Sequence, residues 1–286
     1  MNLWLILAIN SITLGGLLFL LSAGFSLIFG LMRIPNLTHG SFFMLGAYLG
    51  VSFLHANFGF WLSAILGALS MAAIGGVIER LLLRRLAGQE LAQVLVTLGL
   101  SFMIADFCLM VWGGDPIPIE TPDNLAGSVP ILSVVFPSYR LAVVAIAVVI
   151  AALLWLMIDR TRLGAMIRAG VDDPQMARMV GIRVSRLFSV IFCLGAGLAG
   201  FAGFMGGPIL SVYPGLDGDM LPLALIVVIL GGTGSLLGAL VGSFVVGFLY
   251  NFGQAVFPEL AYVILFLPML IVLVIRPQGL FGRIAS

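Results

Sequence analysis

Long apolar runs separated by short polar segments dominate this 286-residue chain. Several runs reach or approach the roughly 20 residues that a helix needs to cross the hydrocarbon core of a bilayer. Apolar residues make up 62% of the chain and charged residues only 9%. The run at 141–158, LAVVAIAVVIAALLWLMI, is apolar all round rather than alternating, which argues against a β-barrel. The sequence therefore predicts an all-α polytopic membrane protein.

Nine apolar windows are expected to form transmembrane or re-entrant helices. They cover residues 3–31, 38–55, 60–83, 91–112, 139–159, 186–207, 219–232, 235–256 and 260–275. The seventh window is short, and a re-entrant half-helix joined to the eighth through GGTGS is an alternative to a full span. Counts of eight and nine are both admissible. The first ten residues lack the basic region and cleavage site of a signal peptide, so we expect them to remain as part of the first span.

The distribution of arginine predicts the orientation. Basic residues near the ends of spans resist translocation and collect on the cytoplasmic side. All 13 basic residues are arginine. If the nine windows alternate across the membrane, every arginine except Arg140 falls on one side, including Arg33, Arg276 and Arg283. The prediction is an N-terminus outside and a C-terminus in the cytoplasm.

Six arginines lie in a polar island at 159–186, between two long apolar runs. Asp173 and Pro174 form an N-cap followed by a proline at the first helical position, and Gly181 is a C-terminal stop. The helix between them has about two turns, which is marginal in isolation. Its apolar residues Met176, Met179 and Val180 fall on one face, and Arg178 points elsewhere. A short capped helix between spans is suited to docking a cytosolic partner.

The absence of lysine excludes several kinds of enzyme. A Walker A loop needs a lysine to reach the phosphates of ATP, and Schiff-base and Ser-Lys chemistry need one as well. Two histidines and two cysteines, widely separated, are too few for an ordinary zinc site, so no metal site is expected. Cys108 and Cys193 lie inside apolar runs and are interpreted as small buried hydrophobic residues.

A break between two apolar segments at 34–48, IPNLTHGSFFMLGAY, is a candidate transport site. Proline and glycine interrupt helices, and broken helices in membranes often mark transport sites because their free backbone groups need protein or water. The candidate residues are Asn36, Thr38, His39 and Gly40, beside Pro35. A cytoplasmic turn in which Asn36 or Thr38 caps the next helix is the alternative, and His39 could equally be a hydrogen-bonded structural residue.

Asp106 is the carboxylate deepest within a predicted span, about two turns from its outer end. Such a group either pairs with a neighbouring helix or lines the pathway. Thr97, Ser101 and Gln93 share its span but are interpreted as spread around it. Two sets of small residues at four-residue spacing indicate close helix packing. They are Gly195, Ala199, Gly203 and Gly207, and Gly234, Gly238 and Gly242.

The segment 113–138 contains five prolines and three acidic residues but no arginine, so it cannot be helical throughout. On the predicted outer face it is either a solvated connector or an acidic platform for an extracytoplasmic partner. The same face is expected to carry Asp217, Asp219 and Glu259.

Motifs along nearly the whole chain resemble the permease subunit of branched-chain amino-acid ABC importers, the LivH type. Their order along the chain is more specific than any one of them. The matching residues are Asn36, His39, Gly40, Gly46, Ala47, Tyr48, Glu79, Arg80, Thr97, Gly99, Thr161, Gly164, Arg168, Ala169, Asp173, Pro174, Gly181, Ile182, Gly231, Gly232, Gly234, Ser235 and the segment RPQGLFG at 276–282.

The chain departs from the family pattern at two places. Thr38 stands where the family often has alanine. Leu86 follows Arg84 and Arg85, where the family often has a proline after the basic residue. The first departure leaves the substrate open, because the family also includes permeases for urea, amides and aromatic acids.

The resemblance implies an ABC importer permease fold and one transmembrane domain over 1–286, with a cytoplasmic loop at 160–185 and a periplasmic loop at 113–138. It also implies a place in the bacterial inner membrane, among lipid, with no role for nucleic acid. The implied partners are a second, LivM-like permease, two cytosolic ATPases and a periplasmic substrate-binding protein. The chain itself would bind no cofactor and would not be an enzyme, since ATP and magnesium would be bound by the ATPases.

Two sets of residues would then carry function. The ATPase-coupling residues are Asp172, Asp173, Pro174, Gln175, Met176, Ala177, Arg178, Met179, Val180 and Gly181. The substrate-pathway residues are Asn36, Thr38, His39, Gly40, Thr97, Asp106, Gly231 and Gly232. A secondary transporter or channel for a small solute is the alternative function. It would need a coupling-ion site or a pore filter, for which Asp106 is the only membrane-buried charge expected.

Overall fold

A computed structural model describes residues 2–32, 36–131 and 134–282, and this part of the chain is mostly helical. Its α-helices are α1 (Asn2–Met32), α2 (His39–His55), α3 (Phe60–Leu81), α4 (Glu90–Trp112), α5 (Ser138–Arg160), α6 (Arg162–Asp172), α7 (Pro174–Met179), α8 (Val184–Leu210), α9 (Leu216–Gly231), α10 (Leu236–Val256) and α11 (Ala261–Ile275). Short 3-10 turns occur at η1 (Leu83–Leu86), η2 (Asp123–Leu125) and η3 (Pro258–Leu260).

Each of the nine predicted windows contains a helix whose ends lie close to the predicted ends. Seven helices are long and apolar enough to cross a membrane, namely α1, α3, α4, α5, α8, α10 and, with η3, α11. The other two, α2 and α9, have only 17 and 16 residues. Of these two, only α9 was expected to be short. The number of crossings therefore stays a prediction.

Two parts of the fold were not predicted. The strands β1 (Ser128–Ile131) and β2 (Val134–Pro137) form an antiparallel hairpin inside the segment 113–138, so the chain is mostly helical rather than all-α.

Helix α6 fills the first half of the arginine-rich island. Its boundary is set by Thr161, whose side chain accepts a hydrogen bond from the backbone nitrogen of Gly164 at 3.3 Å.

Helix α8 lies at the centre of the bundle and packs against α1, α2 and α3. Its small residues let the backbones approach closely, as the spacing of Gly195, Ala199 and Gly203 predicts. A Cβ atom on Gly195 would lie 2.8 Å from the carbonyl oxygen of Gly24 in α1, and one on Gly203 would overlap the carbonyl oxygen of Phe43 in α2. The core of the molecule is therefore built on backbone contacts to α8.

The second set of small residues is only partly helical. Gly238 and Gly242 lie in α10 and pack against Gly231 and Val227 of α9. Gly234 precedes α10 and has a φ of +77°, in the left-handed region that glycine tolerates. It contacts Gly30 of α1 instead. Gly234 therefore does not take part in the helix packing that its four-residue spacing from Gly238 predicts.

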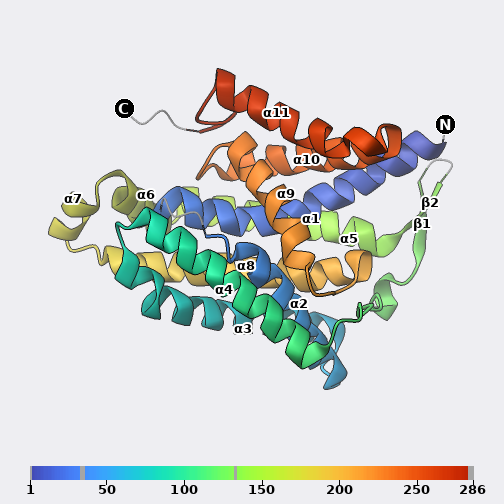
Figure 1. The fold of residues 1–286 in the computed structure, drawn as a ribbon, viewed down its shortest axis with the longest axis horizontal. Coiled ribbons are helices and arrows are strands. Elements are labelled where there is room, and N and C mark those ends of the chain that lie inside the picture. The colour runs from blue at the N-terminus through green and yellow to red at the C-terminus, as the bar shows by residue number, and fades with distance from the viewer. Residues whose placement is uncertain (1, 33–35, 132–133, 283–286) are drawn as a thin grey trace.

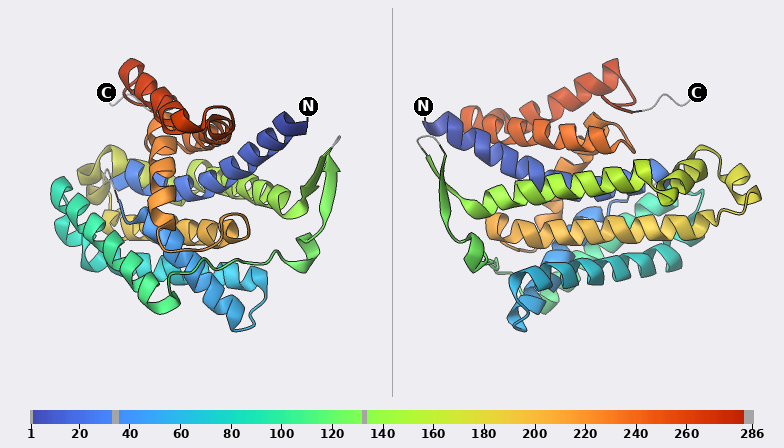
Figure 2. Two further views of the ribbon diagram at one scale, coloured as in Figure 1. Left: turned by 45° about the vertical axis from the view of Figure 1, so that its right-hand side comes forward. Right: turned by 180° about the vertical axis from the view of Figure 1, so that it is seen from behind.

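The two ends of the bundle differ in composition. Helices α6 and α7 project from one end, and the hairpin β1–β2 lies at the opposite end with the N-terminus (Figure 1). Figure 2 shows the same separation from behind. The arginine-rich ends of α3, α5 and α11, and the start of α8, gather at the end that carries α7. Arg33 and Arg283, which also entered the orientation argument, lie outside the described residues.

Candidate functional site

Helix α2 begins inside the bundle rather than at its end. Asn36, Thr38 and His39 are fully buried. The His39 Nε2 atom lies 3.0 Å from the carbonyl oxygen of Leu21, well within α1, and the imidazole stacks on Phe25 with 5.0 Å between ring centroids. The broken segment therefore brings the first turn of α2 beside the interior of α1. Pro35, which was expected to contribute to the break, lies outside the described residues.

Asn36 and Thr38, the two candidate caps of the alternative cytoplasmic turn, are both buried. Thr38 occupies the N-cap position of α2 but makes no side-chain cap bond. Asn36 supplies part of that role, since its Oδ1 atom accepts a hydrogen bond from the Thr38 backbone nitrogen at 3.2 Å. The start of α2 is thus a buried polar turn.

One face of α4 covers this turn. Its buried residues Gln93, Thr97, Ser101, Ile104 and Cys108 follow a spacing of three to four residues and share that face. The interpretation that the first three are spread around the helix was therefore wrong. The Thr97 hydroxyl accepts a hydrogen bond from the Leu37 backbone nitrogen at 3.3 Å, and the Thr38 hydroxyl donates to the Thr97 carbonyl at 2.9 Å. These bonds join α4 to the break.

Asp217, at the start of α9, completes the cluster. Its Oδ2 atom accepts a hydrogen bond at 2.9 Å from the hydroxyl of Ser41, which is buried in the first turn of α2. A Cβ atom on Gly40 would lie 2.8 Å from the Asp217 carbonyl oxygen. Asp217 was expected on the outer face, but it lies against the start of α2, near the middle of α4. An acidic residue opening a short helix gave no signal of this position in the sequence.

Two buried polar atoms in this cluster lack partners within the described part of the chain. They are the amide nitrogen of Asn36 and Nδ1 of His39. Since the Leu21 carbonyl only accepts, Nε2 of His39 carries the proton, and Nδ1 of the neutral ring is an acceptor. Buried polar atoms are normally satisfied, so such atoms need an explanation. The cluster therefore contains a buried donor and a buried acceptor without partners among the described residues, together with the Asp217 carboxylate.

Five of the eight predicted pathway residues come together here, namely Asn36, Thr38, His39, Gly40 and Thr97. The other three lie elsewhere. Asp106 is exposed on the opposite side of α4. Gly231 packs against Gly238, and Gly232, with a φ of +100°, lies against Gly279 and Gly282. Gly231 and Gly232 therefore lie where the turn between α9 and α10 meets residues 279–282.

The expected capped helix in the arginine-rich island is α7. The Oδ1 atom of Asp173 accepts hydrogen bonds from the backbone nitrogens of Gln175 and Met176, both at 2.9 Å. Gly181 ends the segment with a φ of +88°, and the Ile182 nitrogen bonds back to the Ala177 carbonyl. Every local signal that predicted this helix is present in the structure.

One face of α7 is apolar and uncovered. Met176, Met179 and Val180 are exposed to 57%, 82% and 71%, whereas Ala177 is buried. Asp172, Gln175 and Arg178 are also exposed. The helix is held mainly through α6, whose Ile167 and Gly170 are buried, with Gly170 against Val184 and Leu187 of α8. A force on α7 would therefore reach α8 directly along the chain and through α6.

Two surface cavities lie near the end of the bundle that carries the hairpin. A cleft of about 650 Å³ lies between the α2–α3 turn and the acidic segment, and its lining includes His55, Trp61, Glu120, Asp123 and Asn124. Tyr213 lies outside this lining, next to Val212, which pairs with Ile117 of the acidic segment. Burial and a hydrogen bond to Asp219 raise the pKa of the Tyr213 phenol. This cleft offers both charge and hydrogen-bonding groups.

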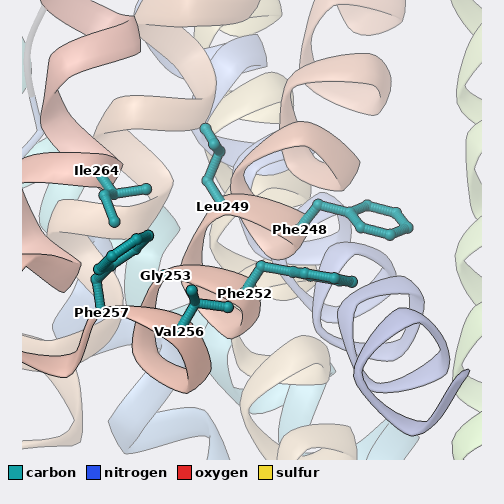
Figure 3. A pocket seen from close by; sticks show the side chains of 7 residues that line it. All are labelled: Phe248, Leu249, Phe252, Gly253, Val256, Phe257 and Ile264. Carbon is teal, nitrogen blue, oxygen red and sulfur yellow. The ribbon is translucent and has the colours of Figure 1, made fainter. Parts of the chain in front are cut away.

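The other cavity, of about 350 Å³, is entirely apolar (Figure 3). Its lining comes from α10, the segment after it and α11, and comprises Phe248, Leu249, Phe252, Gly253, Val256, Phe257 and Ile264. None of these side chains carries a hydrogen-bonding group. Among the described residues, no group of three or more His, Cys, Asp or Glu side chains is placed to hold a metal ion.

Comparison with known proteins places this geometry in a family. The family described as the permease component of branched-chain amino acid transport systems matches residues 7–273. The chain belongs to this permease family. The permease is 28% identical to the high-affinity branched-chain amino acid transport system permease proteins LivH of Salmonella typhimurium and BraD of Pseudomonas aeruginosa. Each match covers 96% of the permease and 94% of the relative.

More distant matches differ in their cargo. The fructose import permease protein FrcC of Rhizobium meliloti is 29% identical over 65% of the permease and 53% of its own length. A chain in the solved complex of PsaBC from Streptococcus pneumoniae with Fab aligns over 93% of the permease and 89% of that chain, at a TM-score of 0.48 and 15% identity. That structural likeness is too low to support an argument.

Proposed function

We propose that this permease is the membrane-spanning subunit of an ATP-driven importer for branched-chain or other amino acids, or for related small polar solutes such as amides, urea or aromatic acids. The cargo named for LivH and BraD supports the first of these. The name of FrcC, a fructose permease, is the reason to keep the substrate class broad. Hydrolysis of ATP, with its magnesium, takes place on separate ATPase chains.

The observation that carries this proposal is the exposed apolar surface of α7. Three neighbouring apolar side chains are more than half exposed on a capped helix that projects from the arginine-rich end. Exposed apolar clusters mark interaction sites when they are held on an ordered element. We therefore assign Asp172–Gly181 as the contact for a cytosolic ATPase.

The proposed assembly contains a second, LivM-like permease, two ATPases and a periplasmic binding protein in the bacterial inner membrane. The gathering of arginines at the end that carries α7 supports a cytoplasmic location for that end and for the C-terminus. The acidic segment 113–138 and its cleft then face the periplasm, with the N-terminus on the same side.

We further propose that solute passes the polar cluster at the start of α2. The unpaired atoms of Asn36 and His39, together with the Asp217 carboxylate, give a passing polar solute hydrogen-bonding groups inside the bundle. Discontinuous helices serve this purpose in other transporters because they free backbone and side-chain groups at mid-membrane. Closure of the ATPases on α7 would move α8 and thereby shift the start of α2.

The test is a matched pair of substitutions at the most exposed residue of α7. Met179→Glu should abolish copurification of the ATPase subunits and ATP-dependent uptake in vesicles, whereas Met179→Leu should retain both. Because Met179 is 82% exposed, neither change should alter the melting temperature of the permease. Uptake that continues without any ATPase would instead identify a secondary transporter or channel.

A further inference from the structure

Asp106 lies on the outer face of α4, in an environment that does not suit a carboxylate. It is exposed, and no hydrogen bond or ion pair reaches it from the described residues. It is six residues before the end of α4 at Trp112, or about 9 Å at the rise of an α-helix. A carboxylate at such a depth is unfavourable against lipid unless another group pairs with it.

The surrounding side chains form an apolar surface that no other part of the described chain covers. Phe102, Met103, Phe107 and Met110 are exposed to 64%, 70%, 52% and 84%. With Asp106 they repeat at intervals of three to four residues and so share one side of the helix. We refer to these five residues as the α4 outer face.

We propose that the α4 outer face packs against a second, different membrane-spanning chain, which supplies a hydrogen-bond donor to Asp106. This inference rests on the proposed function, in which the assembly contains two permeases. A second copy of this chain is the less suitable occupant. An isologous contact across α4 would bring two carboxylates together, and like charges at close range repel.

The location has a consequence for transport. The opposite side of α4 carries Thr97 and Ser101, which face the start of α2. A partner on the α4 outer face would therefore lie one helix away from the polar cluster. Movement of the two permeases against each other would act on α4 and change how tightly it covers that cluster.

Photo-crosslinking in the complete transporter tests the inference. A benzophenone amino acid at Met103 or Met110 should form an adduct with the second permease chain. The same probe at Val149 of α5, which is 57% exposed, should form adducts with lipid only. Three results would each overturn the inference. The probes on α4 could form adducts with lipid only, they could form adducts with another copy of this chain, or the probe at Val149 could form adducts with the second permease to the same extent.

Substitution of Asp106 provides an independent readout. Asp106→Leu should reduce the amount of second permease retained on purification about tenfold, because the partner's donor would be left unpaired. Asp106→Asn keeps an accepting oxygen and should retain it. Equal retention by the Leu and Asn variants would also overturn the inference. A purified, active transporter with no second membrane chain would refute the proposed assembly instead, so the two failures are distinguishable.

Discussion

Removal of the cap on α7 should uncouple the ATPases from transport without unfolding the permease. Asp173 satisfies two backbone nitrogens at the start of a six-residue helix, and both bonds measure 2.9 Å. Loss of such a cap costs about 1 kcal/mol. A helix of fewer than two turns has little other stabilisation, so this cost should raise the open population of α7 about fivefold.

The assay is hydrogen exchange of the peptide that covers residues 174–182, combined with ATP-driven uptake. In Asp173→Ala, exchange in that peptide should accelerate about fivefold, and uptake should fall because less of the permease carries an ordered α7. The global melting temperature should barely change, because Ala177 is the only buried residue among Gln175–Met179.

Asp173→Asn is the matched control. Asparagine keeps an accepting oxygen at the cap and ranks with aspartate in this position, so exchange and uptake should stay close to those of the unmodified permease. Equal effects of the Ala and Asn variants would show that the negative charge matters rather than the cap. Unchanged exchange in Asp173→Ala would refute the reasoning altogether.

Three further substitutions test the packing and the polar cluster. Gly203→Ala should destabilise the permease by roughly 1–3 kcal/mol in a thermal melt, because the new methyl group overlaps the carbonyl oxygen of Phe43 in α2. As the control, Gly99→Ala places a methyl group with no atom within 4 Å and should leave the melt unchanged. Thr97→Val should reduce uptake roughly fivefold, since it leaves the partly buried Leu37 backbone nitrogen without its acceptor. Ser101→Ala removes only a bond within α4 and should leave uptake unchanged. Asp217→Leu should impair uptake more than Asp217→Asn, which still accepts from α2, and equal uptake by the two would exclude a role for this carboxyl oxygen.

The elements that the sequence predicts well are those whose signals are local. Apolar runs determine where the long helices lie, because each must keep its backbone bonded within a bilayer. The α7 helix was predictable from Asp173, Pro174 and Gly181, since a cap, an initial proline and a terminal glycine act within a few residues. The same reasoning missed α6, because its boundary depends on Thr161 in an arginine-rich segment without a long apolar run.

The parts that could not be predicted depend on long-range contacts. Ser41 and Asp217 are 176 residues apart, and nothing within either segment indicates that they meet. The depth at which α2 begins was equally hidden, because a break at Asn36–Gly40 has the same local pattern inside a bundle as at its surface. Asp106 illustrates the reverse difficulty, since its position within a span was clear but the side of α4 on which it lies was not.

The packing of α8 explains how a force on α7 can reach the start of α2. Where two helices meet through side chains, small displacements can be absorbed by rotamer changes at the contact. At Gly195 against Gly24, and at Gly203 against Phe43, the contacts involve backbone atoms directly. Such contacts have no side-chain freedom with which to absorb a shift, so α1 and α2 must move with α8. We therefore expect a displacement at the α7 end to reposition Asn36 and His39 rather than to dissipate along the way.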